Sequence, residues 1–187
     1  MAKQQQREKR SSSELPRHEA DPAAGPVHWS VIESPVGPLL AAEQAGSIVR
    51  LNFLGDAAPD PEPHWVADDA ALDALRVQLG EYFAGERTEF ELDVRTVGTE
   101  FQMAVWAALR EIPFGETATY GDIAEAIGRP RAVRAVGGAN HANPVSIVVP
   151  CHRVIGADGS LTGFGGGLGT KETLLGLEAR ALAAGAA

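Results

Sequence analysis

A single cysteine, Cys151, is the residue of this 187-residue chain best suited to act as a nucleophile. Because no second cysteine is present, we expect neither an internal disulfide nor a multi-thiolate metal site. A lone cysteine is more often a small buried apolar residue than a nucleophile, and its neighbours decide between the two. His152 and Arg153 follow directly. Groups of this kind raise the thiolate fraction of a thiol whose ordinary pKa is about 8.5, so the sequence predicts nucleophilic chemistry here.

Spacing alone does not identify the side chain that acts on the Cys151 thiol. Adjacent side chains of an extended segment point to opposite sides, so we expect His152 to reach the sulfur through a turn or a bridging water. A papain-like hydrolase would need a histidine distant in the sequence, and none of the others lies in a comparable setting. The apolar run 145–149 is predicted to be a buried extended segment that ends at the cysteine. A nucleophile in that position is held by the core and faces a pocket.

The charge pattern divides the chain into two halves. The formal net charge is -9, which argues against a nucleic-acid partner because phosphate binding depends on Lys and Arg. However, residues 1–94 carry 8 basic and 17 acidic side chains, whereas residues 95–187 carry 8 of each. Within the neutral half, Arg129, Arg131 and Arg134 lie close together. DNA binding by the second half is therefore compatible with the composition.

The first half is predicted to contain a tail and a small α+β domain. Residues 1–26 are polar and charged, which is typical of a disordered tail. From Val27, short apolar runs split by turn residues predict an antiparallel meander through residue 54. Apolar residues at helical spacing predict a helix over 69–84, and Phe90–Val94 alternates like a further strand. We expect this first domain to span residues 27–95.

The second half, 96–187, is predicted to be mostly helical. A helix begins after Thr99, a good N-cap, and ends near Pro113. Short helices are predicted over 120–127 and from Arg131 to about Ala142, joined by a Gly-Arg-Pro turn in a helix-turn-helix shape. Small residues leave the surface of the helix that begins at Arg131 nearly free of large side chains. Such a surface suits close approach either to a DNA backbone or to a neighbouring helix. The fold class is therefore α+β: a small antiparallel-sheet domain with one helix, then a helical, winged-helix-like domain.

The run Pro150-Cys151-His152-Arg153-Val154 carries a resemblance to a known protein family. It resembles the active-site motif of the O6-alkylguanine-DNA alkyltransferases, and the resemblance extends from about Thr99 to Glu178. The flanking matches are Phe101-Gln102, Val105-Trp106, Ile112-Pro113, Tyr120-Gly121, Arg134-Ala135-Val136-Gly137, Asn140, Asn143-Pro144, Gly166-Gly167-Leu168 and Lys171. The first half is similar to the family only in general layout.

The resemblance implies single-turnover DNA repair. Cys151 would accept the alkyl group from O6-alkylguanine, and from O4-alkylthymine as well, with His152 as base acting through water. Glu178 would orient His152, and Asn143 would brace the turn that carries the cysteine. The DNA itself supplies the alkyl group, so no cofactor and no metal are implied. Some relatives bind zinc through cysteines in the first domain, and this chain has none there.

The resemblance also assigns residues to DNA and to the pocket. Arg134 would enter the base stack through the minor groove while the damaged base is flipped out, with Tyr120 supporting the flip. The other residues implied at the DNA surface are Ala135, Gly137, Gly138 and Asn140. The residues implied in the pocket are Val154, Phe164, Gly165 and Lys171, with carbonyls of Cys151 and Val154 reading the exocyclic amine. Phe164 stands where most relatives carry Tyr and Gly165 where some carry Ser, so we expect an altered substrate range or rate.

Two alternatives remain open from the sequence. Relatives exist that keep the DNA-binding shape and replace the cysteine, and such a lesion binder is disfavoured because Cys151 is present. A helix-turn-helix regulator with a sensor cysteine would bind a defined sequence, whereas the enzyme binds almost any duplex. The chain shows no apolar run long enough for a bilayer and no signal peptide, so we expect a monomer in the cytoplasm. A sulfur sealed in apolar packing, with no cavity for a purine, would contradict the enzyme interpretation.

Overall fold

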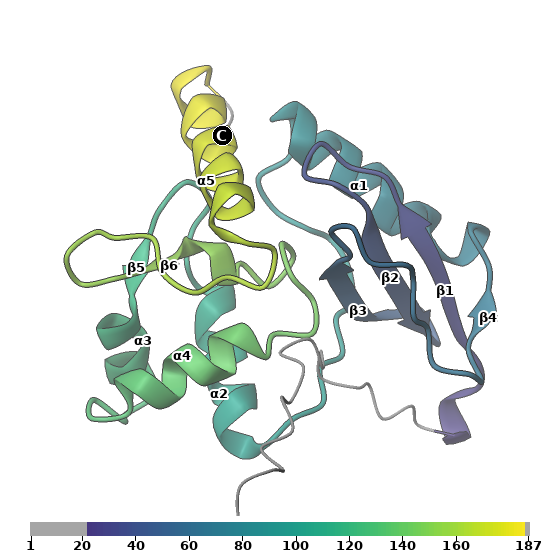
Figure 1. Cartoon of the computed structure of the whole chain (residues 1–187), viewed down its shortest axis with the longest axis horizontal. Coiled ribbons are helices and arrows are strands. Elements are labelled where there is room, and N and C mark those ends of the chain that lie inside the picture. The colour runs from purple at the N-terminus through teal and green to yellow at the C-terminus, as the bar shows by residue number, and fades with distance from the viewer. Residues whose placement is uncertain (1–21, 186–187) are drawn as a thin grey trace, which may run out of the picture.

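The computed structural model describes residues 22–185, arranged as two lobes side by side (Figure 1). A sheet with one long helix forms the N-terminal lobe, and helices form most of the C-terminal lobe. The predicted α+β class is therefore confirmed. Most of the predicted tail, residues 1–21, lies outside the described residues, and Pro22–Ala24 forms a 3-10 turn, η1. Within residues 22–185, no helix combines the length and apolar character needed to cross a membrane.

The N-terminal sheet is mostly antiparallel, as predicted. Its strand order is β3-β2-β1-β4, in which β4 pairs in parallel with β1 at one edge. The strands are β1 (Val27–Ile32), β2 (Leu39–Gln44), β3 (Ser47–Phe53) and β4 (Val66–Ala67). A 3-10 turn, η2 (Ala70–Leu72), leads into helix α1 (Asp73–Ala84). The apolar face of α1 is buried against the sheet through Leu75, Leu79 and Tyr82, which confirms the helix predicted from its spacing.

The prediction of a strand over Phe90–Val94 is wrong. This segment forms a single bridge to β3, in which the Ile48 amide donates to the Asp93 carbonyl at 2.8 Å. The reason lies in the free edge of β3, which serves two segments. Ile48 pairs with the chain around Val94, while Leu51 pairs with the chain around Val145. A continuous ladder with either segment would exclude the other, and the shared edge instead joins the two lobes.

The C-terminal lobe is built from four helices and a small parallel sheet. The helices are α2 (Glu100–Arg110), α3 (Tyr120–Ala126), α4 (Val133–His141) and α5 (Leu168–Ala183). Thr99 caps α2 through a capping box with Gln102, and Thr119 caps α3 in the same way, so both predicted starts are confirmed. The sheet pairs β5 (Ala118–Thr119) with β6 (Val154–Ile155), which no sequence pattern indicated. Two-residue strands lack the alternation that identifies longer ones.

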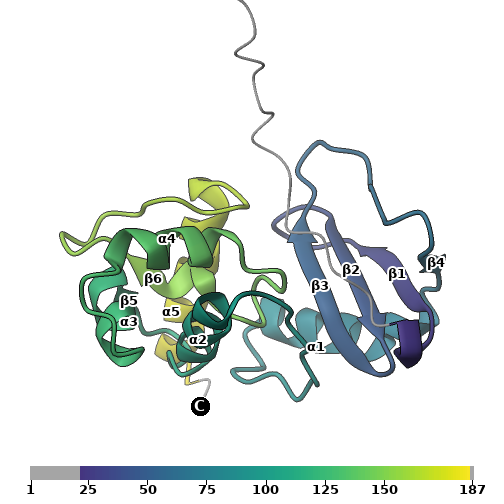
Figure 2. The same cartoon turned by 90° about the horizontal axis from the view of Figure 1, so that it is seen from below.

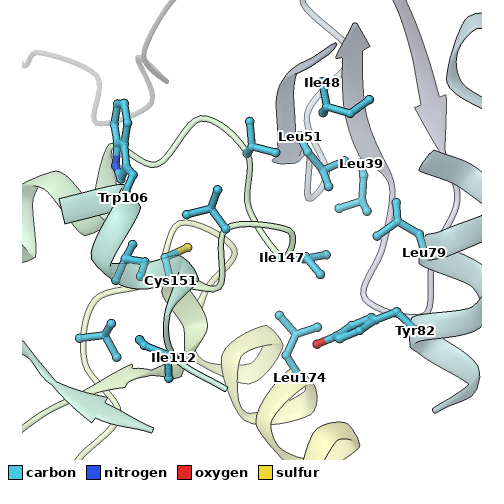
Figure 3. Packing of buried hydrophobic residues seen from close by; sticks show 14 of the residues in the cluster. Leu39, Ile48, Leu51, Leu79, Tyr82, Trp106, Ile112, Ile147, Cys151 and Leu174 are labelled. Atoms are coloured by element: carbon cyan, nitrogen blue, oxygen red, sulfur yellow. The ribbon is translucent and has the colours of Figure 1, made fainter. Parts of the chain in front are cut away.

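One hydrophobic cluster runs through both lobes. It extends from Leu39 and Leu51 in the sheet through Ile147 and Cys151 to Leu174 on α5 (Figure 3). Figure 2 shows β3 as the strand that lies nearest to the helical lobe. The division of the chain near residue 95 thus separates two sets of secondary-structure elements that share one hydrophobic core. We expect the two lobes to unfold together for this reason.

Candidate active site

Cys151 begins a short 3-10 turn, η3 (Cys151–Arg153), and its side chain is 3% exposed. The predicted burial of residues 145–149 is confirmed except at the half-buried Val148, but the predicted extended conformation is wrong beyond Val145. After Val145 bridges Leu51, the chain turns back on itself, and the Val149 amide donates to the Val145 carbonyl at 2.9 Å. Ile147 adopts a left-handed φ of 71° to make this turn. The cysteine therefore follows a tight loop rather than a strand.

Asn143 holds the two ends of this loop together. Its side-chain amide donates to the Val149 carbonyl at 2.8 Å, and its Oδ1 accepts from the Val145 amide at 3.1 Å. Both bonds are buried, so each replaces water that the backbone groups have lost. This bracing fixes the direction in which the chain enters Cys151. Asn143 is thus more than a turn former before Pro144.

A fully buried carboxylate, Glu178 on α5, lies against the two residues that follow the cysteine. His152 Nε2 lies 2.8 Å from Glu178 Oε1, and both side chains are 0% exposed. Arg153 donates to the same carboxylate from Nε and Nη2, and its Nη1 donates to the Ile112 carbonyl. Glu178 is therefore not a solvated residue of the helix surface. Its charge is compensated instead by neighbouring donors, which burial of a carboxylate requires.

These contacts determine the protonation states of the pair. Burial opposes ionisation of Glu178, but the hydrogen bonds and charges of His152 and Arg153 outweigh it and lower its pKa to about 2. Burial also lowers the pKa of His152, against the opposing effect of Glu178. The imidazole is therefore neutral, with its Nε2 hydrogen donated to the carboxylate. Its Nδ1 has no hydrogen-bond partner among residues 22–185 and carries the lone pair that can accept a proton.

The thiol itself is protonated at neutral pH in this conformation. Burial raises the pKa of Cys151, and hydrogen bonds from Asn143 and Ser146 and the charge of Lys171 offset this only in part. The prediction that neighbouring groups raise the thiolate fraction of Cys151 is therefore wrong for this conformation, because the effect of burial on its pKa is larger. The sulfur therefore needs a base at the moment of reaction, and the open Nδ1 of His152 can supply one.

A loop between β6 and α5, residues 156–167, flanks the cysteine turn and is held at three points. The Tyr120 hydroxyl donates to the Thr162 carbonyl at 3.3 Å, and Lys171 Nζ donates to the same carbonyl at 3.0 Å. The Phe164 ring packs edge to face on Phe53 of β3 with centroids 5.3 Å apart. A Cβ on Gly166 would lie 2.7 Å from the Phe53 ring, so only glycine fits there. We call residues 156–167 the pocket loop.

The expected open cavity at the sulfur is not among the described cavities. One, of about 370 Å³, lies between β3 and α2 and includes Trp106 and Arg110; the other lies beside Glu81 and Arg87. Neither includes Cys151. The criterion of a ready-formed cavity at the sulfur is therefore not met in this conformation, because Cys151 is buried in the apolar cluster. The enzyme interpretation then requires that the pocket loop or the cysteine turn moves to admit a purine. Among residues 22–185, no His, Cys, Asp and Glu side chains gather into a group that could hold a metal ion.

Helix α4 presents part of its small-residue surface to solvent. Arg134, Ala135 and Gly138 are exposed, whereas Gly137 is half-buried, where a Cβ would lie 3.8 Å from the Tyr120 ring. The predicted close approach to a neighbouring helix is thus seen at Gly137, while Ala135 and Gly138 leave a bare surface open to solvent. Asn140 departs from its predicted place at the DNA surface, because it is 3% exposed and donates to the Cys151 carbonyl at 3.3 Å. Its burial excludes a DNA contact in this conformation and makes it a second brace of the cysteine turn.

The predicted pocket residues lie around the cysteine turn with different exposures. Val154 and Lys171 are buried, and Lys171 Nζ donates to the Val154 carbonyl as well as to the pocket loop. Phe164 is half-buried and Gly165 is exposed. The carbonyls of Cys151 and Val154 both accept a protein donor already. The Cys151 carbonyl accepts from both Asn140 Nδ2 and the Val154 amide, so both of its lone pairs are used, whereas Lys171 Nζ occupies one lone pair of the Val154 carbonyl.

Three contributors to the site were not identified from the sequence. Tyr82 on α1 donates its hydroxyl to Glu178 Oε1 at 2.8 Å, and the Gly115 amide donates to Oε2 at 2.9 Å. Arg153 was noted only as a neighbour of the cysteine. Tyr82 matched the helical spacing of core residues, and nothing local distinguishes a buried phenol that bonds a carboxylate from one that only packs.

Comparison with known proteins identifies relatives over both lobes. The family model described as "6-O-methylguanine DNA methyltransferase, ribonuclease-like domain" matches residues 27–96, and the one described as its "DNA binding domain" matches residues 100–180. A methylated-DNA-protein-cysteine methyltransferase of Mycobacterium bovis is 49% identical over 152 residues, which cover 81% of this chain and 92% of that protein. The protein of that name from Methanosarcina acetivorans is 48% identical over 153 residues, covering 81% and 98%.

Solved structures agree with these sequence matches. The crystal structure of Mycobacterium tuberculosis OGT in complex with DNA is similar to this chain with a TM-score of 0.78 and 49% identity, covering 82% of this chain and 94% of that one. The crystal structure of Mycobacterium tuberculosis O6-methylguanine methyltransferase has the same TM-score and identity.

The buried carboxylate predicts a specific pH dependence of stability. The pKa of Glu178 is about 2 in the folded chain against an ordinary 4.5, so its contribution to the free energy of unfolding is present above pH 4.5 and is lost as the pH falls toward 2. That contribution is roughly 3 kcal/mol, because one pKa unit corresponds to about 1.4 kcal/mol. We expect Glu178→Gln to be less stable than wild type by about 3–5 kcal/mol at neutral pH, since Arg153 loses its partner. This difference in the free energy of unfolding between wild type and Glu178→Gln becomes smaller as the pH is lowered.

Urea unfolding of both proteins at a series of pH values measures this gap. Glu172→Gln, at an exposed position of the same helix, is the matched control and keeps the wild-type dependence. A gap between wild type and Glu178→Gln that stays constant as the pH falls would contradict the assignment of the buried charge.

Proposed function

The chain belongs to the 6-O-methylguanine DNA methyltransferase family, and we propose that it repairs DNA by moving the alkyl group of O6-alkylguanine onto Cys151, once per molecule. The observation that carries this proposal is the arrangement around the sulfur. A lone thiol opens a turn whose next residue is a neutral histidine with a free Nδ1, and a buried carboxylate holds the other ring nitrogen. This is the arrangement of an activated nucleophile, its base and the group that orients the base.

The proposed transfer balances in atoms and electrons. His152 Nδ1 takes the thiol proton, through a bridging water, and the Cys151 sulfur attacks the alkyl carbon. The S–C bond forms as the C–O6 bond breaks, and the electron pair of that bond stays with guanine, which takes up a proton and is restored. The product thioether is stable to the groups around it, since none of them is a nucleophile aimed at that carbon. One chain therefore repairs one base.

We further propose that the base leaves the helix to reach the sulfur. An alkyl carbon inside a duplex cannot align with a sulfur that is 3% exposed, and extrusion of a base costs a few kcal/mol. The exposed, small-residue face of α4, with Ala135 and Gly138, suits entry into a minor groove. Arg134 on that face fills the vacated stack, and Tyr120 supports the turned nucleotide.

Admission of the base requires movement of the pocket loop, which Tyr120, Lys171 and Phe53 hold closed. Once admitted, the base edge meets the Val154 carbonyl and displaces a donor from the Cys151 carbonyl to bond there, and the Gly165 amide faces O6. Phe164 and Gly165 replace hydroxyl-bearing residues of most relatives and some relatives, respectively. We propose that this loop sets the range of alkyl groups, with O4-alkylthymine as a second substrate.

The decisive test is intact-mass analysis after incubation with duplex DNA that contains O6-methylguanine. We expect wild type to gain one methyl group per chain and Cys151→Ser to gain none, because serine is a far weaker nucleophile. Duplex DNA without the lesion is the control and leaves the mass unchanged. A wild-type protein that binds the lesion and keeps its mass would instead indicate the lesion binder, and selective binding of one sequence would indicate the regulator.

Arg134→Ala tests base extrusion. We expect the single-turnover rate on duplex DNA to fall roughly 10- to 100-fold, since the variant no longer offsets a few kcal/mol of unstacking. On a single-stranded oligonucleotide, which has no partner strand to separate, the loss is much smaller. Arg180→Ala removes an exposed arginine of α5, outside the predicted DNA surface, and is the control, with near wild-type rates on both. Equal losses of Arg134→Ala on the two substrates would refute the stacking role.

Phe164→Tyr tests the influence of the pocket loop on substrate range. The variant regains a hydroxyl, and one hydrogen bond to an alkylated base changes a rate by roughly 2- to 10-fold. We expect the ratio of methyl to benzyl transfer rates to change, measured by single-turnover assays on the two lesions in one duplex sequence. Identical ratios in wild type and variant would show that this position does not select the alkyl group.

A further inference from the structure

We propose that Tyr82, on helix α1 of the N-terminal lobe, is a positioning residue for the Glu178–His152 pair. The N-terminal lobe then takes part in alkyl transfer and is more than a scaffold. This inference rests on the proposed function of Cys151, and it assigns a chemical role to a lobe whose other contacts with the site are apolar packing and the backbone bonds of β3 to the loop before the cysteine. It also names a specific atom, the Tyr82 hydroxyl oxygen, through which the role is exerted.

The geometry places this hydroxyl on the oxygen that matters. Tyr82 donates to Glu178 Oε1 at 2.8 Å, and the same oxygen lies 2.8 Å from His152 Nε2. Tyr82 is 0% exposed, so no water competes for the bond. In Figure 3 its hydroxyl points from α1 across the boundary between the lobes, toward α5 beside Leu174. A phenol from one lobe and an imidazole from the other thus share one carboxylate oxygen.

The aromatic surroundings of Tyr82 do not require a hydroxyl. Its ring packs against Phe83, Phe90 and Phe114, with centroids 5.3, 5.5 and 6.0 Å away. Phenylalanine would fill this space equally well. Burying a phenol is favourable only when its hydroxyl is bonded, and here the bond goes to Glu178. The hydroxyl is therefore explained by the carboxylate rather than by the packing.

Each group that faces the pair has a defined effect on it. Oε1 accepts from Tyr82, His152 and Arg153, and Oε2 accepts from Arg153 and the Gly115 amide. Lys171 acts on His152 only through its charge. Burial and the Glu178 charge raise the pKa of Tyr82, so it stays protonated and can only donate. A donor on Oε1 withdraws electron density from that oxygen, so the oxygen stabilises a protonated His152 less. The pKa of the imidazole is therefore lower, and the ring stays neutral with its Nδ1 free.

Tyr82→Phe deletes this one donor. Without it, Oε1 binds the imidazole hydrogen more strongly and His152 protonates at a higher pH. We expect the acid limb of the single-turnover rate to move to higher pH by about half a pH unit. The rate on the acid limb falls by up to about 3-fold, which is the most that half a pH unit allows, and the rate on the plateau at higher pH stays near wild type. DNA affinity, measured by fluorescence anisotropy, stays unchanged because Tyr82 lies inside the protein.

Two controls separate positioning from a structural role. Ser30→Ala removes another buried hydroxyl of the N-terminal lobe, one that bonds Asp69 and the Val31 carbonyl and lies on β1 away from Glu178. It is expected to lower stability without moving the acid limb. In a Glu178→Gln background, Tyr82→Phe is expected to cause no further shift, since it acts through that carboxylate. A uniform loss of rate at every pH in Tyr82→Phe, or an equal shift in Ser30→Ala, would overturn the proposal.

A measurement without DNA distinguishes failure of this inference from failure of the proposed function. The NMR titration of the His152 ring reports its pKa directly. We expect the midpoint to rise in Tyr82→Phe and to stay at the wild-type value in Ser30→Ala. If wild type accepts no methyl group but this midpoint still rises, the positioning role stands and the proposed reaction is wrong. An unchanged midpoint overturns the positioning role whatever the activity.

Discussion

The buried charge of Glu178 is the constraint on which the rest of the structure depends. A carboxylate removed from water is tolerated only when donors surround it, and here they come from three parts of the chain other than the helix that carries the acid. Helix α1 supplies Tyr82, the turn after α2 supplies Gly115, the cysteine turn supplies His152 and Arg153, and α5 carries the acid itself. Placing this one side chain therefore fixes the sheet lobe, the helical lobe and the nucleophile relative to one another.

The shared core performs the same task with apolar groups. Leu39, Leu51 and Leu79 of the first lobe belong to one cluster with Ile147 and Leu174 of the second. The edge of β3 adds backbone bonds to the loop that precedes the cysteine. Apolar packing is non-directional and brings the lobes together, whereas the donors around Glu178 set their orientation. The site thus needs both lobes, although the residues with chemical roles lie mainly in the second.

Local signals explain which features could be predicted from the sequence. The capping boxes at Thr99 and Thr119, the spacing of Leu75 and Leu79 and the Cys151-His152 pair are all encoded within a few residues. The predicted strand over 145–149 failed because a valine-rich run does not reveal the left-handed Ile147 or the braces from Asn143. Tyr82 and Arg153 were missed for a related reason. Their partner lies on α5, so their roles depend on tertiary contacts that periodicity cannot show.

In the proposed reaction, burial of Cys151 protects a nucleophile that is used only once. A thiolate open to solvent would react with any electrophile or oxidant, and each such event would inactivate the chain. Here burial raises the pKa of the thiol, so the resting sulfur is protonated and unreactive. The base that can activate it, His152 Nδ1, is kept neutral by the same low-polarity surroundings and by the donors on Glu178. Reactivity therefore depends on entry of a substrate that reaches the sulfur. The burial that at first argues against a nucleophile is what confines its one reaction to the proper substrate.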